Sequence, residues 1–249
     1  MMMEEDYNRR FSSLARLYGD EGLQKLENAH VIVAGIGGVG SWAAEALART
    51  GVGELTLIDL DNVAESNINR QLHSLTSTLG APKIEVMAER IANINAGCKV
   101  HCVEDFLTLE NIPSIIQFSE GKTGWILDAI DEVRVKAALI AHARFNKLKI
   151  ITTGAAGGKT IPTDLMIDDL NNSFHDALCA KLKSYLKKEY GFPSKPKKMN
   201  VPVVFSQENS TTKTAAGGLN CSGYGSVVTM TATMGMMAAG FIINKIVEA

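Results

Sequence analysis

Cysteine is scarce in this chain. Its 249 residues include four cysteines, Cys98, Cys102, Cys179 and Cys221, and no C-x-x-C pair. The missing pairs exclude a zinc knuckle of that pattern, and nothing in the spacing suggests a disulfide framework. The N-terminal segment MMMEEDYNRRF lacks a basic stretch followed by an apolar one, so we expect no signal peptide. These absences favour a protein of the reducing cytoplasm.

The chain also has little excess charge of either sign. The formal net charge is −2, which excludes a globally basic nucleic-acid binder but leaves room for a local basic patch. Between Asn220 and Asn244 there is no charged residue at all, over a length close to that of a membrane span. The segment is rich in Gly, Ala, Thr and Met, which favours a buried C-terminal helix. Association of this helix with a membrane stays the alternative.

Apolar β-rich runs alternate with helical patterns along the first two thirds of the chain. Strands are expected at 31–34, 54–58, 100–103, 125–127 and 149–153, and helices at 41–50, 83–95 and 133–145. Further on we expect a strand at 160–168, a helix at 174–190 and a loop over 191–219. The pattern predicts an α/β fold with a doubly wound, Rossmann-like, mostly parallel sheet. A C-terminal extension with a long apolar final helix follows it.

The stretch HVIVAGIGGVG carries a glycine pattern that fits two chemistries. Gly35-x-Gly37-x-x-Gly40 is the dinucleotide fingerprint, and Gly38 makes the same turn fit the phosphates of a nucleoside triphosphate. Asp59, 19 residues beyond Gly40, suits a ribose hydroxyl in either case. The glycines alone therefore do not separate a dehydrogenase that uses NAD from an enzyme that uses ATP.

Residues after the second strand favour ATP. The segment DLDNVAESNINRQ brings a set of polar residues to the expected ligand-binding edge, and a lysine follows it: Asp59, Asp61, Asn67, Arg70, Gln71 and Lys83. Phosphoryl or nucleotidyl transfer needs such cations, because negative charge builds up on the leaving pyrophosphate. A hydride transfer does not. Ordinary surface charges are the alternative interpretation of the arginine and the lysine.

Two acids follow the fourth strand in the sequence LDAIDE. Asp128 ends the strand and Asp131 stands at the start of the next helix. Asp131 suits Mg²⁺ beside a triphosphate, because a hard cation prefers carboxylate oxygens. It also suits the N-cap of the helix. Acids, cations and glycines at one edge together predict a nucleoside triphosphate site.

The motifs GIGGVG, IDLDNVAESNINRQ, APK and DAIDE resemble the ThiF/MoeB/HesA superfamily, whose fold is shared with ubiquitin-activating enzymes. The resemblance implies one adenylating domain over residues 1–249, with a nucleotide-binding core at 10–155 and a substrate side at 156–249. Members activate a carboxylate with Mg·ATP and release pyrophosphate. The cofactors implied are therefore ATP and Mg²⁺.

The resemblance also assigns roles. Arg70, Lys83, Asp131 and Arg16 are the implied catalytic residues, with Asp131 also the metal ligand. Arg16 is expected to reach into the second subunit of a homodimer, with Arg10 as the alternative. The remaining implied nucleotide-binding residues are Gly35, Gly37, Gly38, Gly40, Asp59, Asp61, Asn67, Gln71 and Asp128.

A narrower resemblance spans nearly the whole chain. RFSSLARLYG, DEVRVKAALIAHARFNK, TTGAAGG and NCSGYGSVVTMTATMG are similar to the branch that dehydrates threonylcarbamoyladenosine in tRNA. This implies ATP-dependent cyclisation of that nucleoside. The alternative is an activator of a ubiquitin-like sulfur-carrier protein, and such activators usually carry the C-x-x-C motifs that this chain lacks.

A tRNA substrate predicts a basic surface, since phosphate contacts dominate binding to nucleic acids. AKLKSYLKKEYGFPSKPKK is rich in lysine, and Lys187, Lys188, Lys197 and Lys198 are the residues we expect to contact tRNA. A solvated helix face is the alternative. Cys221, in GGLNCSGYG, is either a packing residue or a thiol for sulfur transfer. Docking of a cysteine-desulfurase or sulfur-acceptor partner is left open.

Overall fold

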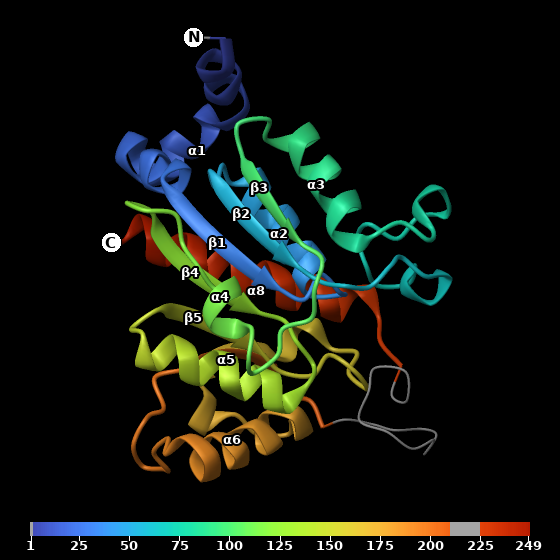
Figure 1. Ribbon diagram of the computed structural model, residues 1–249, viewed down its shortest axis with the longest axis vertical. Helices are drawn as coiled ribbons and strands as arrows, with labels where there is room; N and C mark the ends of the chain where they lie inside the picture. Colours follow the sequence, from blue (N-terminus) through green and yellow to red (C-terminus); the bar gives the residue numbers. More distant parts are fainter. Residues whose placement is uncertain (1, 210–224) are drawn as a thin grey trace.

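Residues 2–209 and 225–249 are described by the computed structural model (Figure 1). These residues form one seven-stranded sheet in the order β3-β2-β1-β4-β5-β7-β6. Its strands are β1 (Ala29–Ala34), β2 (Glu54–Ile58), β3 (Lys99–Val103), β4 (Thr123–Asp128), β5 (Lys149–Thr153), β6 (Leu165–Asp169) and β7 (Pro202–Ser206). All neighbouring pairs are parallel except β6 with β7. The expectation of a mostly parallel α/β sheet is confirmed.

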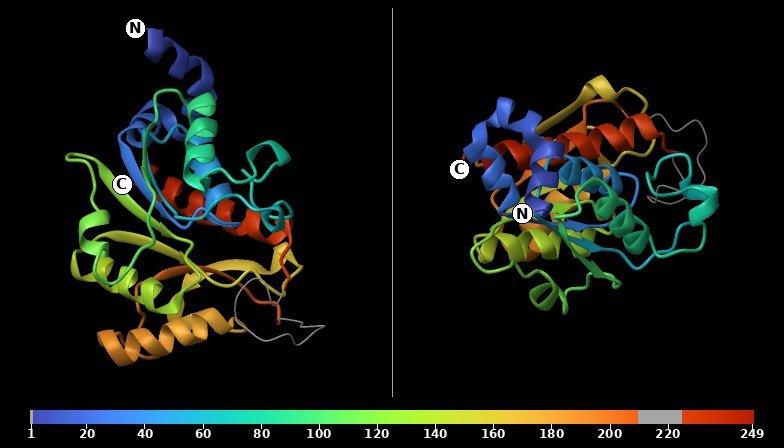
Figure 2. Two further views of the ribbon diagram at one scale, coloured as in Figure 1. Left: turned by 45° about the vertical axis from the view of Figure 1, so that its right-hand side comes forward. Right: turned by 90° about the horizontal axis from the view of Figure 1, so that it is seen from above.

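Helices cover both faces of this sheet (Figure 2). They are α1 (Met2–Glu27), α2 (Gly40–Arg49), α3 (Lys83–Ile94), α4 (Ile112–Ile115), α5 (Val133–Phe145), α6 (Ala177–Tyr190) and α8 (Val228–Val247). Short 3-10 turns are η1 (Glu65–Asn67), η2 (Thr76–Thr78), η3 (Pro162–Asp164) and η4 (Leu170–Asn172). One apolar core lies beneath α2, α3 and α8, and a second lies beneath α4, α5 and α6.

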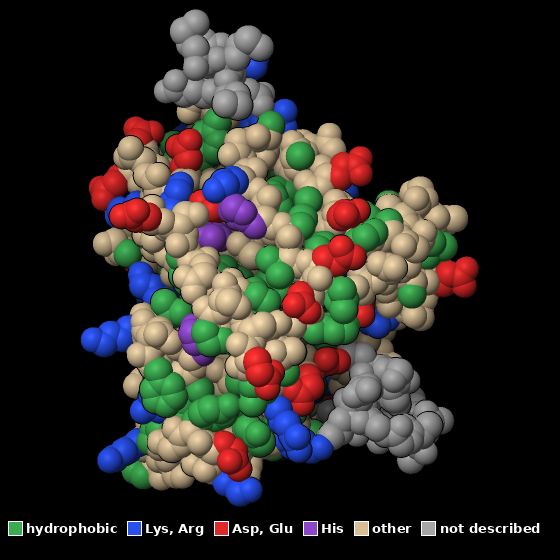
Figure 3. Space-filling view, viewed as in Figure 1, with side chains coloured by type: hydrophobic (Ala, Val, Ile, Leu, Met, Phe, Trp, Pro, Cys, Tyr) green, Lys and Arg blue, Asp and Glu red, His purple; other side chains and the backbone are tan. Residues whose placement is uncertain are grey.

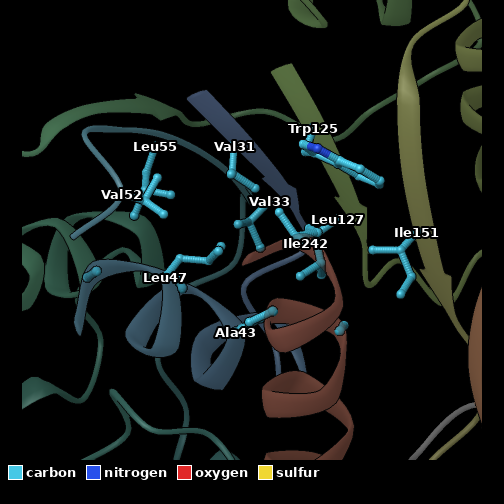
Figure 4. Packing of buried hydrophobic residues seen from close by; sticks show 14 of the residues in the cluster. Val31, Val33, Ala43, Leu47, Val52, Leu55, Trp125, Leu127, Ile151 and Ile242 are labelled. Atoms are coloured by element: carbon cyan, nitrogen blue, oxygen red, sulfur yellow. The ribbon is translucent and has the colours of Figure 1, made fainter. Parts of the chain in front are cut away.

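The central strands are buried along their whole length, which is why they appear in the sequence as continuous apolar runs. On one face of the sheet, Ala43 and Leu47 of α2 and Ile242 of α8 pack toward Val33 and Leu127 (Figure 4). Because the strands are parallel, their carboxyl ends meet at one edge of the sheet. This edge carries the turns that follow β1, β2 and β4.

The final helix is part of the core. α8 is the helix in the described part of the chain that is long and apolar enough to cross a membrane, with a mean hydropathy of 1.3, and half of that window is buried inside the protein. It packs along α2, and a side chain at Gly235 would collide with the Val39 carbonyl oxygen. The buried-helix interpretation of the charge-free segment therefore accounts for its composition.

Three expectations for the second half of the chain were wrong in part. The strand expected at 160–168 is β6 alone, preceded by the turn η3. The helix expected from residue 174 begins at Ala177, with Asp176 as its N-cap. The expected loop over 191–219 contains β7, which inserts between β5 and β6. Residues 210–219 of that loop lie outside the described residues.

Candidate functional site

The turn from β1 into α2 leaves one open backbone surface. Gly35 has a φ of +90°, a conformation that favours glycine, and its N–H donates to the Ile58 carbonyl oxygen at 2.9 Å. A side chain at Gly40 would collide with the Gly35 carbonyl oxygen, so helix and strand approach closely there. A side chain at Gly37 would meet no atom within 4 Å. The turn thus presents Gly37 to solvent, where a phosphate can approach the backbone at the start of a helix.

The end of β2 holds this turn in place. Asp59 Oδ2 accepts from the Ile36 N–H at 2.7 Å, and its Oδ1 accepts from the Asp61 N–H at 2.9 Å. The Asp59 side chain is only 9% exposed. Its carboxylate therefore shapes the glycine turn in addition to the ribose contact that we expect of it.

Lys83 is buried at the same edge. Its side chain is 5% exposed, and Nζ lies 2.7 Å from Asp61 Oδ2 and 4.0 Å from Asp59 Oδ1. Burying an ammonium group is costly unless it is paired, so a position of this kind is unusual for an ordinary surface lysine. The alternative interpretation of Lys83 as a solvated surface charge is wrong. The lysine and the two acids form one charged cluster beside the glycine turn.

Arg70 lies beside the glycine turn and is partly buried. Its Nη1 donates to the Ser66 carbonyl oxygen at 2.6 Å and to Asn69 Oδ1 at 3.0 Å. Its Cγ lies 3.4 Å from where a Cβ on Gly38 would be. The arginine side chain therefore passes over the glycine turn and its guanidinium is held close by.

The amides of the same segment are buried. Asn67 is 8% exposed and its Oδ1 accepts from the Ala64 N–H at 3.1 Å. Gln71 is 7% exposed, and its Oε1 has no hydrogen-bond partner among the described residues. An unpartnered buried acceptor costs about 1–3 kcal/mol. A ligand donor at this edge would remove that cost.

Sequence reasoning missed His73, which lies two residues beyond Gln71. His73 is 2% exposed, and its Nε2 lies 2.8 Å from the Ile36 carbonyl oxygen. Because a carbonyl only accepts, Nε2 carries the proton. Burial lowers the pKa of His73, so the ring stays neutral, and it binds the carbonyl oxygen of the residue whose N–H binds Asp59. His73 stands at the end of the polar segment that follows β2, and this position was the signal in the sequence that could have pointed to it.

The turn after β4 separates its two acids. Asp128 is fully buried, with Oδ2 at 3.0 Å from Lys136 Nζ and 2.6 Å from Thr152 Oγ1. Asp131 is exposed, and Glu132 is the N-cap of α5, accepting from the Arg134 and Val135 N–H groups at 3.1 and 2.6 Å. The interpretation of Asp131 as the helix cap is therefore wrong. Its carboxylate faces solvent at the strand-end edge, while the contact expected between Asp128 and the nucleotide stays a prediction.

A magnesium ion at this edge would have few protein ligands. Among the described residues, no three His, Cys, Asp or Glu side chains are grouped to hold a metal ion. Mg²⁺ suits such a site because it keeps several waters and binds through one or two carboxylates together with substrate phosphates. The exposed Asp131 fits that donor set. Ala129 and Ile130, which precede Asp131, pack against Gly35. The turn that carries Asp131 therefore adjoins the glycine turn.

The lysines expected to contact tRNA lie away from this edge. Lys187 and Lys188 are in the last turn of α6, and Lys197 and Lys198 follow before β7. Because β7 runs parallel to β5, residues before Pro202 lie at the amino edge of the sheet. Basic side chains stand at several separate points along the bottom of the molecule, with hydrophobic and acidic ones between them (Figure 3). The 14 residues of α6 span about 20 Å, which is roughly the distance between this patch and the nucleotide edge.

The two candidate arginines of α1 differ in their surroundings. Arg10 Nη1 donates to the Asn93 and Ile94 carbonyl oxygens at 3.0 and 3.1 Å, at the carboxyl end of α3. Arg16 is exposed. Arg10 is exposed as well, so exposure does not separate the two arginines, and the reach of Arg16 into a second subunit stays a prediction.

The cysteines that the structure describes are not activated. Burial raises the pKa of the Cys98 thiol to about 12, and it also raises the pKa of Cys102 and Cys179. A thiol of high pKa is a poor nucleophile, because the thiolate is the reactive form. Cys221 lies outside the described residues.

A cavity of about 620 Å³ lies at the opposite, amino edge of the sheet. Glu54 lines it, and its Oε1 accepts from Ser119 Oγ at 2.5 Å and from His101 Nε2 at 2.7 Å. His30 lies beside it, with Nε2 at 2.8 Å from Thr56 Oγ1 and Nδ1 accepting from the Ser119 N–H at 3.2 Å. These groups satisfy one another, and the cavity is remote from the glycine turn.

An open glycine turn, an acid at the end of β2 and buried or partly buried cations together define a nucleotide-binding α/β protein. The sequence motifs and the fold together assign the protein to one family within this class. The chain belongs to the ThiF family, whose profile matches residues 7–249. This membership confirms the resemblance and sets aside the NAD-dependent dehydrogenase.

Similar proteins cover the chain almost completely. The tRNA threonylcarbamoyladenosine dehydratase of Haemophilus influenzae is 42% identical over 253 residues, covering 98% of this chain and 95% of that protein. The Escherichia coli enzyme of the same name is 44% identical over 260 residues, covering 98% and 96%. The crystal structure of E. coli TcdA in complex with ATP has a TM-score of 0.88 at 45% identity and covers 96% of this chain and 94% of that one.

More distant relatives match less of the chain. The molybdopterin-synthase adenylyltransferase of Salmonella typhimurium is 36% identical over 150 residues, which are 60% of this chain and 57% of that protein. The similarity to that activator thus covers little more than half of either protein.

Proposed function

We propose that this protein is an ATP-dependent tRNA threonylcarbamoyladenosine dehydratase. The observation that carries the proposal is the strand-end edge, where Arg70 lies against the glycine turn and the buried Lys83 pairs with the acids that follow β2. Similarity to dehydratases of that name over 98% of the chain supplies the substrate. The activity requires tRNA, so the cytoplasm is the compartment in which the protein acts.

The first step is activation of a carboxylate. An oxygen of the threonylcarbamoyl carboxylate attacks the α-phosphorus of ATP, the bond to pyrophosphate breaks, and an acyl adenylate forms. Lys83 and Arg70 neutralise the charge that develops on the phosphates, which is where fixed cations lower a barrier most. Asp59 holds the ribose and the glycine turn binds the phosphates. Mg²⁺, held by Asp131 and phosphate oxygens, would supply further charge neutralisation on the leaving pyrophosphate.

The second step closes a ring. A nitrogen or oxygen of the ureido group attacks the activated carbonyl carbon, the bond to AMP breaks, and the proton of the attacking group is released. The nucleoside has then lost the elements of water. Because the nucleophile belongs to the same molecule, orientation supplies much of the rate and no enzyme nucleophile is needed. The high thiol pKa values of Cys98, Cys102 and Cys179 accord with this.

The substrate and the assembly follow from the same proposal. The lysine patch at the end of α6 binds the phosphate backbone of a tRNA whose modified nucleoside occupies the nucleotide edge. A tRNA is longer than the roughly 20 Å that α6 spans. Arg16 completes the site of a second subunit, so the working form is a homodimer. A cysteine-desulfurase or sulfur-acceptor partner would act through Cys221, and the chemistry of cyclisation does not require it.

Mass spectrometry of tRNA nucleosides tests the activity. Purified protein is incubated with threonylcarbamoyl-modified tRNA and Mg·ATP, and the nucleoside is expected to lose the mass of one water. Reactions without ATP and with Lys83→Met protein are the controls and should leave the nucleoside unchanged. An unchanged nucleoside with the wild-type protein, together with AMP transfer to a ubiquitin-like carrier, would establish the sulfur-carrier activator instead.

A further inference from the structure

Asp128 and Lys136 form a buried ion pair to which the proposed adenylation chemistry gives no direct part. Both side chains have no exposed surface, and their charged atoms are 3.0 Å apart. Replacing such a pair by apolar side chains of similar volume often leaves a protein equally stable. Stability alone therefore does not account for the pair, and the contacts that it makes are the better guide.

All the acceptors of the ammonium group lie in one turn. Besides Asp128 Oδ2, Lys136 Nζ donates to the Ile130 carbonyl oxygen at 3.0 Å and to the Asp128 carbonyl oxygen at 3.3 Å. Asp128 Oδ1 accepts from the Ile130 N–H at 3.1 Å. The pair thus binds both polar groups of Ile130, the residue immediately before Asp131.

The same turn is fixed from the sheet. The Ala129 N–H donates to the Ala34 carbonyl oxygen at 2.9 Å, and Thr153 Oγ1 donates to the Asp128 carbonyl oxygen at 3.2 Å. The Asp131 carboxylate is therefore exposed on a backbone that the buried pair and two strands hold rigidly. A carboxylate on a free loop would lose both backbone and side-chain freedom on binding a metal, and one on a fixed backbone loses less.

We propose that Asp128 and Lys136 are positioning residues that fix the Asp131 carboxylate against the metal-bound triphosphate. The inference rests on the proposed function, because it takes Asp131 to be the magnesium ligand. It gives Asp128 an indirect role, through Lys136 and the turn. The positioning role requires no contact of either side chain with the nucleotide.

Calorimetry of ATP binding tests the inference. The dissociation constant is measured with Mg²⁺ and with EDTA, and the ratio of the two constants reports the contribution of the metal. Lys136→Met combined with Asp128→Asn removes both charges at nearly unchanged volume. Partners that orient metal ligands are commonly worth about 10- to 100-fold in metal affinity, so we expect the ratio to fall by about tenfold. A direct contact of Asp128 with the nucleotide would change both constants alike and would leave their ratio unchanged.

The chain offers a matched control. Lys159 and Asp176 form a second ion pair that is also fully buried, at 3.2 Å, but they hold the residues after β5. Lys159→Met combined with Asp176→Asn should keep the wild-type ratio. If the first pair were merely structural, both double variants would change in thermal stability. The ratio of the two dissociation constants would then stay at the wild-type value in both.

Two further variants separate the possible failures. If Asp131→Asn lowers the ratio and the Lys136/Asp128 double variant does not, the positioning role is wrong and the metal role stands. If Asp131→Asn keeps the wild-type ratio, the assignment of the metal ligand fails and the inference fails with it. Should the double variant not fold, Thr152→Val removes the 2.6 Å hydrogen bond to Asp128 Oδ2, and a ratio unchanged from wild type would overturn the inference.

Discussion

Two neighbouring carboxylates at the start of α5 should respond in opposite ways to replacement by alanine. Asp131 is exposed, and we assign it to magnesium. Glu132 accepts two backbone N–H hydrogen bonds as the N-cap of the helix. Asp131→Ala should therefore impair catalysis with little effect on folding, and Glu132→Ala should do the reverse.

The magnitudes follow from these contacts. Loss of an N-cap costs about 1 kcal/mol, which lowers the Tm of a chain of this size by about 2–4 °C. An exposed side chain away from such features changes stability by about 0.5 kcal/mol or less. Loss of metal-assisted charge stabilisation costs several kcal/mol in the transition state, and about 3 kcal/mol corresponds to a roughly 100-fold slower reaction.

Scanning calorimetry and single-turnover conversion of threonylcarbamoyl-modified tRNA measure the two effects on the same preparations. The rate is expressed per folded molecule, so that a loss of stability is not mistaken for a loss of catalysis. An Asp131→Ala protein with a sharply lower Tm and a wild-type rate would refute the reasoning. A slow Glu132→Ala protein with an unchanged Tm would refute it equally.

The remaining predictions concern the nucleotide, the basic patch, the amino edge and Cys221. Calorimetry should detect binding of Mg·ATP and no binding of NAD, and the opposite result would remove the basis of the proposed activity. Changing the patch residues to Glu together (Lys187, Lys188, Lys197 and Lys198) should weaken tRNA binding in a filter assay and flatten its salt dependence, with ATP affinity as the internal control. Burial lowers the pKa of His30 from 6.5 to about 4, so the unfolding free energy should fall as the pH drops through that interval, and His30→Gln should flatten the fall in urea titrations. Cys221→Ala should retain cyclisation, and complete loss of product with normal ATP binding would indicate a catalytic thiol.

The direction of the acid effect follows from the contacts of His30. Its Nδ1 accepts from the Ser119 N–H, so a proton on Nδ1 removes that hydrogen bond in the folded protein only. A folded pKa below the unfolded one means that the stability is complete above about pH 6.5 and is lost as the pH falls toward 4. Glu54 adds to the loss at lower pH. Burial alone would raise its pKa, but hydrogen bonds from Ser119 and His101 outweigh this and hold it at about 2.

Much of the sheet was predictable because its signals are local. β2, α5 and β5 begin and end where the apolar runs and turn residues indicate. β7 was not predictable: PVVFS is a short apolar run next to prolines, and such a run has no periodicity that separates a buried strand from a loop. Its place between β5 and β6 depends on pairing across the sheet.

For the site, the sequence indicated which residues take part better than it indicated the contacts that they make. The strand-end rule brought Asp59, Lys83 and the glycine turn together, because parallel strands share a carboxyl edge. It gave no signal that Glu132, one residue after Asp131, would cap the helix, since capping preferences favour aspartate. The pairing of Lys159 with Asp176 joins two loops 17 residues apart, and no local pattern encodes it.

The position of α8 has a consequence for how the polypeptide is made. This helix supplies Met234, Ala238 and Ile242 to the core that also holds Val31 and Trp125. During synthesis the strands that carry the glycine turn leave the ribosome long before α8 does. Until those last residues emerge, the part of the sheet face that α8 covers beside α2 and α3 stays exposed and must be shielded from aggregation. A truncation that removes α8 should therefore yield insoluble protein, even though every residue assigned to ATP precedes it.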